Sequence, residues 1–500
     1  MSAQNSRSLA LRRSFNATLS LLLACSVAAC DQKERGKTEV TVIGSEPPAI
    51  VDPAAGILTE PQAILLSNVA QGLVRFDASG QIVPGMAERW NVTDDGLSYI
   101  FRLEAGEWPN GRKITAEQVA RLLRRQIASR SENALKDTLG AVDQIVAMTD
   151  RVIEITLKAP RPNLLALLAQ PELAIVYENQ GSGPFRIAPD SKRPTLDLVR
   201  TVSDLDEEVT REDEVFLTSS KARDAVSTFL AGRTDLVLGG TYSDLPYARA
   251  ENLPRNALRF DPAAGLFGLV PARADGPLAD VELRQLLAQA IDRQALIDAL
   301  NIPGLLPRAT LLEPGLEGIS NPVPPQWMAL PVAERRVQLA SRAAQLFDGV
   351  ERPVIRIALP DTPGGKILLS RLVADLGTLG LTLERVELDQ PAYLKLIDAV
   401  APSTSSAWFV RQFRCGATPI CDETADELMD GARSTPVAAQ RNGLLMQAAQ
   451  LIDDQQLFIA IAAPIRWSLV SDRVQGFAPN RYARHSLTGL GDRLDRNRGE

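Results

Sequence analysis

The chain has 500 residues, of which 45% are hydrophobic and 23% are charged. This length and balance exclude a disordered or collagen-like chain and are typical of a folded protein with more than one core. The formal net charge is −7, and the basic residues are scattered rather than gathered into a patch, which argues against nucleic acid as a partner.

The first 29 residues have the layout of a cleavable export signal. Arg7, Arg12 and Arg13 precede the apolar run 19–23, and small residues follow before the first acidic residue, Asp31. The apolar run is too short to span a bilayer comfortably, so we interpret it as a signal rather than as a buried helix. The arginine pair partly resembles a twin-arginine export motif, but ordinary secretory signals are also basic here, and the ordinary route is favoured.

The signal ends in Val-Ala-Ala-Cys at 27–30, which resembles a bacterial lipobox. Cys30 would become the first mature residue and carry diacylglycerol, with a further amide-linked chain because one acyl chain anchors only marginally. The alternative is an incidental cysteine at an ordinary cleavage site. Residues 30–37 are then a polar tether, and lipid is the only expected membrane anchor. Asp31 favours the inner membrane, so we expect a lipid-anchored protein on the periplasmic side of the envelope.

The body of the chain keeps two cysteines, Cys415 and Cys421, because Cys25 lies in the signal. In an oxidising periplasm they are expected to close a small loop through a disulfide. A zinc site would need two more ligands, and the chain has a single histidine, His485. Free buried cysteines are the remaining alternative. No metal or cofactor is expected.

The first elements after the tether follow hydrophobic periodicity. Alternation over 39–43 predicts a strand, and the prolines at 47, 48 and 53 predict an extended loop. Ile64, Leu65, Val69 and Leu73 have helical spacing. Short strands or hairpins are expected next, at 73–76 and 98–103 in particular.

The run GLVRFDASGQIVPGMAERWNVTDDGLSYIFRL, at 72–103, resembles the N-terminal signature of family 5 solute-binding proteins. Known members of that family bind oligopeptides, dipeptides, nickel complexes or opines. The run alternates apolar strand residues with turn formers, which predicts a compact sheet with tight connections. The continuation at 110–125 is similar to the family's turn and capped helix, with Thr115 as N-cap and Gln118 completing a capping box.

Further matches are spread over most of the chain. GSGPFRI at 181–187 is similar to the family's Gly-rich turn into a strand, and no Gly-Lys-Ser/Thr follows it, so it is not a phosphate loop. The stretch 225–238 resembles the family's helix and strand, with Gly232 ending the helix. The pattern at 281–300 predicts a helix packed on a core. The strands predicted at 354–359 and 381–386 and the helix predicted at 366–379 indicate an α/β lobe. The helix predicted at 437–452 and the strand predicted at 457–462 resemble the C-terminal part of the family.

The resemblance implies an α/β fold of the two-lobed periplasmic binding protein type, with a hinge and an extra α/β subdomain in the first lobe. The expected divisions are the signal at 1–29, the tether at 30–37, the first lobe at 38–50 and 176–262, its inserted subdomain at 51–175, the second lobe at 263–465, and a return to the first lobe at 466–500. Ligand between hinged lobes favours a closed form that a transporter can recognise. The implied function is solute capture for an ABC importer, with its permease subunits as partners and a monomeric state.

The sequence departs from the family around Trp408. Family peptide binders tend to carry an aspartate three residues after this tryptophan, and it pairs with the amino terminus of the peptide. Here Arg411 stands in that place, and Arg414 follows three residues later. An arginine repels an ammonium group and offers a planar fork to carboxylate, phosphate or sulfate. We therefore predict an anionic or carboxylate-bearing solute, beside the peptide-like one that the family implies, with these three residues as ligand contacts.

Other interpretations of these residues stay open. Arg411 and Arg414 would also fit a solvated surface loop, or pairing with acids such as Glu423 or Asp426, and Trp408 would fit the core beneath a cleft wall. Two more ligand-binding candidates come from loops that face the cleft in the family. Tyr242 lies in the loop 239–244, and Glu46 lies in the loop after the first strand, although structural turns are an equally good account of both.

Catalysis is not expected. A serine or cysteine nucleophile usually needs a base, and His485 lies in RYARHSLTGL without a nucleophile elbow or any other catalytic frame. A periplasmic hydrolase is therefore the weaker alternative. A ligand-sensing or scaffold lipoprotein on the same fold is the stronger one, because fold does not settle ligand.

Overall fold

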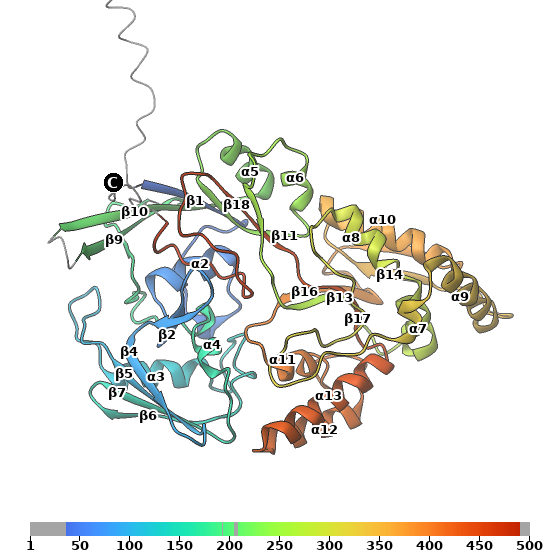
Figure 1. Ribbon diagram of the computed structural model, residues 1–500, viewed down its shortest axis with the longest axis horizontal. Helices are drawn as coiled ribbons and strands as arrows, with labels where there is room; N and C mark the ends of the chain where they lie inside the picture. The colour runs from blue at the N-terminus through green and yellow to red at the C-terminus, as the bar shows by residue number, and fades with distance from the viewer. Residues whose placement is uncertain (1–36, 193, 205–208, 491–500) are drawn as a thin grey trace, which may run out of the picture.

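The computed structural model describes residues 37–192, 194–204 and 209–490 (Figure 1). The export signal, Cys30 and the tether up to residue 36 lie outside the described residues. Across the part of the chain that is described, no helix combines the length and the apolar character needed to cross a bilayer.

A seven-stranded sheet collects strands from both ends of the described chain, and its order is β12-β18-β11-β1-β10-β9-β8. The first strand, β1, runs parallel to β10 on one side and to β11 on the other. Late in the chain, β18 returns to pair antiparallel with β11 and β12. The strands are β1 (Lys37–Ile43), β8 (Arg186–Ile187), β9 (Leu196–Asp204), β10 (Val209–Ser220), β11 (Leu236–Thr241), β12 (Leu258–Phe260) and β18 (Arg466–Val470). We call this sheet, with α2 (Glu60–Val69), α5 (Ala222–Leu230) and α6 (Leu245–Arg249), lobe I.

The Gly-rich turn at 181–187 seals the end of α2. The backbone N–H of Gly183 donates to the carbonyl of Val69 at 2.9 Å, and that of Phe185 donates to the carbonyl of Asn68 at 3.1 Å. A Cβ at Gly181 would stand 2.3 Å from the Cα of Ala70, so no larger residue fits this close approach. The sequence motif therefore serves backbone packing.

The inserted subdomain is built on a four-stranded antiparallel sheet with the order β4-β5-β7-β6. Phe101 and Trp108 are buried in its core. Helix α3 (Ala116–Gln126) begins with the predicted capping box, because Thr115 and Gln118 exchange side-chain and backbone hydrogen bonds. The other elements are η1 (Pro53–Ala55), β2 (Val74–Phe76), β3 (Ile82–Pro84), β4 (Ala87–Val92), β5 (Ser98–Leu103), β6 (Val142–Thr149), β7 (Val152–Leu157), α4 (Leu164–Leu168) and η2 (Pro171–Leu173).

Lobe II is a five-stranded sheet with the order β15-β14-β16-β13-β17, enclosed by helices (Figure 1). Its central strand β16 runs antiparallel to β13 and parallel to β14. The strands are β13 (Gly265–Pro271), β14 (Val354–Ala358), β15 (Thr382–Val386), β16 (Leu394–Val400) and β17 (Ile459–Ala462). The helices are η3 (Pro277–Ala279), α7 (Val281–Ala290), α8 (Arg293–Leu300), η4 (Gln326–Ala329), α9 (Val332–Leu346), α10 (Pro363–Gly377), α11 (Ser406–Arg411), α12 (Glu423–Ser434) and α13 (Ala438–Asp454).

The single helix expected at 281–300 is wrong, because the chain forms two helices there. Helix α7 ends at Ala290, and Ile291 is extended. Asp292 then caps α8, accepting the backbone N–H of Ala295 at 3.1 Å. Because Leu and Ala recur on both sides of the break, the hydrophobic spacing alone did not reveal it. The sequence did contain one sign of the break, because Asp292 is a residue type that commonly caps the start of a helix.

The chain crosses between lobe I and lobe II twice, once after β12 and once after β17. The two crossings lie together, since the backbone N–H of Asp261 donates to the carbonyl of Arg466 at 3.0 Å. Beside them, the guanidinium of Arg466 contacts the Asp398 carboxylate of lobe II at 2.7 Å, and the side chains are 17% and 15% exposed. Two adjacent crossings form a hinge, so the two-lobed α/β fold expected from the sequence is confirmed.

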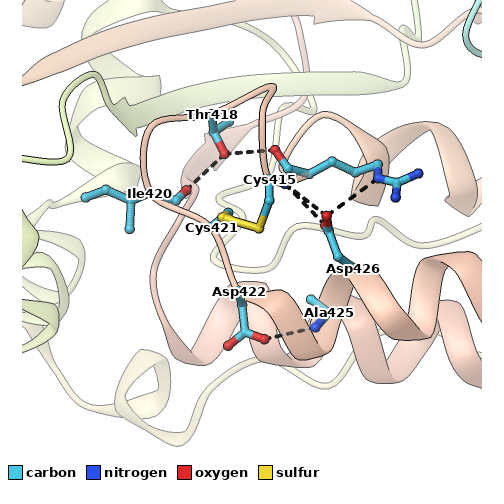
Figure 2. The surroundings of a disulfide bond; sticks show 8 residues. Cys415, Thr418, Ile420, Cys421, Asp422, Ala425 and Asp426 are labelled. Atoms are coloured by element: carbon cyan, nitrogen blue, oxygen red, sulfur yellow. Dashed lines mark hydrogen bonds and ion pairs between the residues drawn. A yellow bond between two sulfur atoms is a disulfide. The ribbon is translucent and has the colours of Figure 1, made fainter.

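The predicted disulfide between Cys415 and Cys421 is confirmed, and it closes the loop between α11 and α12 (Figure 2). The backbone N–H of Cys415 donates to the carboxylate of Asp426 at 3.2 Å. Within the loop, the Thr418 hydroxyl donates to the carbonyl of Ile420 at 2.9 Å. The loop is thus attached to the first turn of α12 by hydrogen bonds as well as by the disulfide.

Replacing Arg466 with Met is expected to destabilise the fold by about 3 kcal/mol, because Asp398 is left buried without its cation. Burial raises the pKa of Asp398, and Arg466 opposes that rise. In the variant, the folded protein keeps a proton on Asp398 that the unfolded chain releases, so stability is greatest at low pH and falls as the pH rises from about 4 towards neutral. Urea denaturation across this range measures it. Adding Asp398→Asn should remove the pH dependence, and a pH-independent loss in the single variant would contradict the assignment.

Replacing both Cys415 and Cys421 with Ser should lower the free energy of unfolding by about 2 kcal/mol, the chain-entropy contribution of a loop of this size. Denaturation of the oxidised wild type and the double variant measures the difference. Wild type under reducing conditions is the matched control and should behave like the variant. A double variant as stable as the oxidised wild type would show that the disulfide does not constrain the unfolded chain.

Candidate functional site

Two cavities lie between the inserted subdomain and lobe II. The smaller one has a volume of about 190 Å³ and is lined by residues 138–167 on one side and by 403–445 on the other. The larger one, of about 1240 Å³, extends to residues near α3 and to the returning C-terminal segment. Trp408, Arg411, Arg414 and Arg433 line both, so these residues mark where the cavities meet.

Trp408 stands in the wall of both cavities on helix α11. Its side chain is 8% exposed and meets Phe409 edge to face, with ring centroids 5.1 Å apart. Phe409 and Val410 are fully buried in lobe II, which holds the short helix on the core. The sequence left open whether Trp408 is a core residue or a ligand contact. In the structure it packs on the core and also borders both cavities.

Arg411 is the last residue of α11 and is half-buried at the junction of the cavities. None of the carboxylates that the structure describes forms an ion pair with its guanidinium. Its pKa is lowered by burial and then by the positive charges of Arg433 and Arg414, while Asp137 and Asp430 oppose the shift. The charge of Arg411 is therefore left incompletely compensated by the protein.

Arg414 differs from Arg411, because acids of α12 already compensate it. Its guanidinium contacts Asp430 at 3.0 Å and Asp426 at 3.7 Å. The pairing considered at the sequence level thus applies to this residue, with Asp430 as the nearer acid. Arg414 lines both cavities, but its charge is used to attach the loop to α12.

Three further arginines line the smaller cavity, and the sequence did not point to them. Arg161 comes from the loop before α4 in the inserted subdomain, whereas Arg433 and Arg441 come from α12 and α13 of lobe II. No ion pair is seen for any of the three among the described residues. The sequence held one indication for Arg161. It lies between two prolines, and prolines at these positions indicate an ordered loop after a strand.

These arginines act on one another. The pKa of Arg161 falls to about 10, through burial first and then through the charges of Arg441, Arg411 and Arg433. The one acidic side chain that lines the smaller cavity, Glu317, is exposed and bonds to Thr404 at 3.3 Å. Like charges gathered around a cavity favour an anion inside it, because the anion lowers the energy of every cation at once.

The inserted subdomain and lobe II touch across these cavities. Arg161 donates to the backbone carbonyl of Arg433 at 3.2 Å, and Arg433 donates to that of Gly140 at 3.4 Å. Deeper in the interface, the Gln170 side chain donates to the carbonyl of Pro402 at 2.8 Å. These contacts join the inserted subdomain to lobe II across the cavities, so the arrangement is a closed one.

The two loop candidates lie elsewhere. Tyr242 is 3% exposed, packs on Phe267 with ring centroids 5.1 Å apart, and lines neither cavity. Glu46 is exposed, accepts a hydrogen bond from Gln62 at 3.4 Å, and also lines neither cavity. Tyr242 instead joins the core between the lobes beside the hinge, because Phe267 belongs to β13 of lobe II.

The single histidine has a packing role. The Nε2 atom of His485 is 3.3 Å from the carboxylate of Asp261, and the ring lies 4.8 Å from that of Phe477. Both members of the pair are buried, and neither lines the two cavities. Among the described residues there is also no group of three or more His, Cys, Asp or Glu placed to hold a metal ion.

Comparison with known sequences places the chain among binding proteins. It is 27% identical over 308 residues to the probable deoxycholate-binding periplasmic protein YgiS of Escherichia coli, covering 55% of this chain and 56% of that protein. It is 23% identical to di/tripeptide-binding protein 1 of Pseudomonas aeruginosa, covering 93% of this chain and 96% of that protein.

Structural comparison and the family model point to the same kind of protein as these sequence relatives. The murein tripeptide binding protein MppA of Escherichia coli superposes with a TM-score of 0.76 at 16% identity, covering 91% of this chain and 97% of that one. Relatives of this kind are named as periplasmic and as solute- or peptide-binding, and one solved structure is named as ABC transporter-associated. Residues 81–394 match the model of the bacterial extracellular solute-binding proteins, family 5 middle region. The chain belongs to this family of solute-binding proteins.

Proposed function

We propose that this protein captures an anionic, carboxylate-bearing solute between its lobes and hands it to the permease subunits of an ABC importer. The observation that supports this most is the set of four arginines, 161, 411, 433 and 441, which line one cavity without carboxylate partners among the described residues. In a chain whose formal net charge is −7, such a local excess of cations needs a binding partner of opposite charge.

The same arrangement accounts for closure on the solute. Arg161 belongs to the inserted subdomain and the other three arginines belong to lobe II, so bringing the two sides together concentrates positive charge. An anion between them turns that repulsion into attraction and favours the closed form over the open one. The importer then receives a loaded protein whose shape differs from that of the empty one.

The residues that would hold the anion are Arg411, at the junction of the cavities, and Trp408 beside it. An arginine fork binds a carboxylate through two parallel hydrogen bonds, and an aromatic face supports the rest of the solute. The name of one relative indicates a bile-acid ligand, which is itself a carboxylate, and that of another indicates short peptides. Solute capture requires no reaction, so the protein would act as a monomeric receptor without catalysis.

Location completes the proposal. Cys30 would carry lipid and hold the protein on the periplasmic side of a membrane, with the inner membrane favoured by Asp31. Anchoring on two or more acyl chains is stable, whereas one chain is marginal. Confinement near the importer raises the rate at which a loaded receptor meets it.

Replacing Arg411 with Met should weaken binding of the preferred anion about 30-fold, which is the loss of about 2 kcal/mol for one charge-assisted contact. The measurement is a thermal-shift screen of the full chain in mild detergent against peptides, opines, sugar phosphates and other carboxylates. Ligand at a hundred times its dissociation constant should add about 2.7 kcal/mol of stability.

Two variants serve as controls for Arg411→Met. Arg414→Met should have a smaller effect, because acids already compensate that charge, and Arg356→Met should have none, since Arg356 lines neither cavity. Equal stabilisation of wild type and Arg411→Met by neutral-ended peptides would overturn the anion proposal. Absence of stabilisation across the whole panel would favour a scaffold role instead of transport.

The full chain with Cys30→Ser should lose lipidation. Expressed in a bacterium that processes lipoproteins, the wild type is expected to show the mass increase of its acyl chains, and the variant is expected to lack it. Cys25→Ser is the matched control and should keep the mass increase. A Cys30→Ser protein that still carries acyl chains would show that the lipid is not on this cysteine.

A further inference from the structure

The smaller cavity combines positive charge with a largely apolar wall. Leu139, Leu157 and Leu164 of the inserted subdomain face Met429 and Leu445 of lobe II around it. Each of these five side chains is at most 5% exposed, so the wall is built from both sides of the closed interface.

Two polar side chains of the same cavity are already engaged. Asn442 donates its amide to the carbonyl of Gly318 at 2.7 Å, and the Ser403 hydroxyl accepts the backbone N–H of Ser405 at 3.4 Å. The apolar part of the wall therefore offers little to water, which needs two to four polar partners to stay in a cavity.

The volume indicates what fits there. An apolar cavity of about 150 Å³ lined by Leu, Ile and Phe stays dry and accepts benzene. The cavity of this protein measures about 190 Å³, so it has room for one six-membered ring and little more. A longer molecule would have to continue into the larger cavity past Trp408 and Arg411, which border both.

Building on the proposed function, we propose that the solute is an amphiphilic anion, with a ring-sized apolar group in the smaller cavity and its negative group at Arg411 and Arg433. The four arginines select the charge, and the leucines together with Met429 select the apolar group. Arg161 and Arg441 line the same cavity and add to the positive charge around the negative group. Any remainder of the solute lies in the larger cavity.

The test separates the contribution of the charge from that of the apolar group. Three small ligands are titrated into the full chain in mild detergent. Phenylacetate has both features, acetate has the charge alone, and phenylacetamide has the ring alone. Isothermal titration calorimetry, with micelles alone as the blank, should show phenylacetate binding about 30-fold or more tightly than either of the others. The ring contributes by leaving water, and the charge by meeting the arginines.

The outcomes distinguish this inference from the proposed function. Equal binding of acetate and phenylacetate overturns the ring chamber and leaves the anion proposal standing. Equal binding of phenylacetamide and phenylacetate overturns the anion proposal and leaves the chamber standing. Absence of binding by all three up to 10 mM, on the order of the weakest useful affinities, overturns the inference.

Two variants of the cavity wall test the size of the chamber, one by filling it and one by enlarging it. Ala432→Leu fills the chamber and should weaken phenylacetate about 10-fold while leaving acetate unchanged, because Ala432 is a buried member of its wall. Leu139→Ala enlarges the chamber and should favour 1-naphthylacetate over phenylacetate relative to wild type. Unchanged selectivity in a folded Leu139→Ala protein would overturn the assignment of this cavity to the apolar group.

Discussion

The return of β18 to the sheet that contains β1 is the constraint on which the rest of the structure depends. Because β18 pairs with β11 and β12, the chain must leave lobe I and come back, and its two crossings are held side by side. Adjacent crossings let the lobes rotate as units about one place. The site lies where the inserted subdomain meets lobe II, so a hinge motion between the lobes opens or closes it.

Buried charges are compensated differently at the hinge and at the cavities. At the hinge, Arg466 and Asp398 neutralise each other across the lobes, which favours a fixed geometry. At the cavities, Arg161 and Arg411 lie near other arginines, and neither forms an ion pair with an acid among the described residues. The hinge pair is thus compensated within the protein, whereas the positive charges at the cavities are compensated only in part. Under the proposed function, this difference would make the closed form depend on an anionic solute.

The disulfide loop connects the site to the stability of lobe II. It follows α11 directly, and its hydrogen bonds reach Asp426 on α12 (Figure 2). Arg414 takes part in the same attachment through Asp430. Helices that carry Arg411 and Arg433 are therefore held in a fixed relation before ligand arrives, which reduces the entropy lost on binding.

Local patterns in the sequence determined much of the fold and part of the site. The strand at 98–103, the capping box at Thr115 and the disulfide are confirmed, since each depends on residues that are neighbours along the chain. The helix at 281–300 was wrong because its periodicity continues across a break made by one capping residue. Family resemblance directed attention to Trp408 and Arg411, and both border the cavities.

Only the tertiary structure decided which distant residues share the site. Arg161 is 250 positions before Arg411 in the chain, and no local pattern links them, yet the closed lobes place both around one cavity. The same folding buries Tyr242 beside the hinge and leaves Glu46 in solvent. The sequence by itself determined strands, caps, disulfide and family, because those depend on nearby residues. The charge and shape of the cavity depend on packing between lobes, which no stretch of sequence contains.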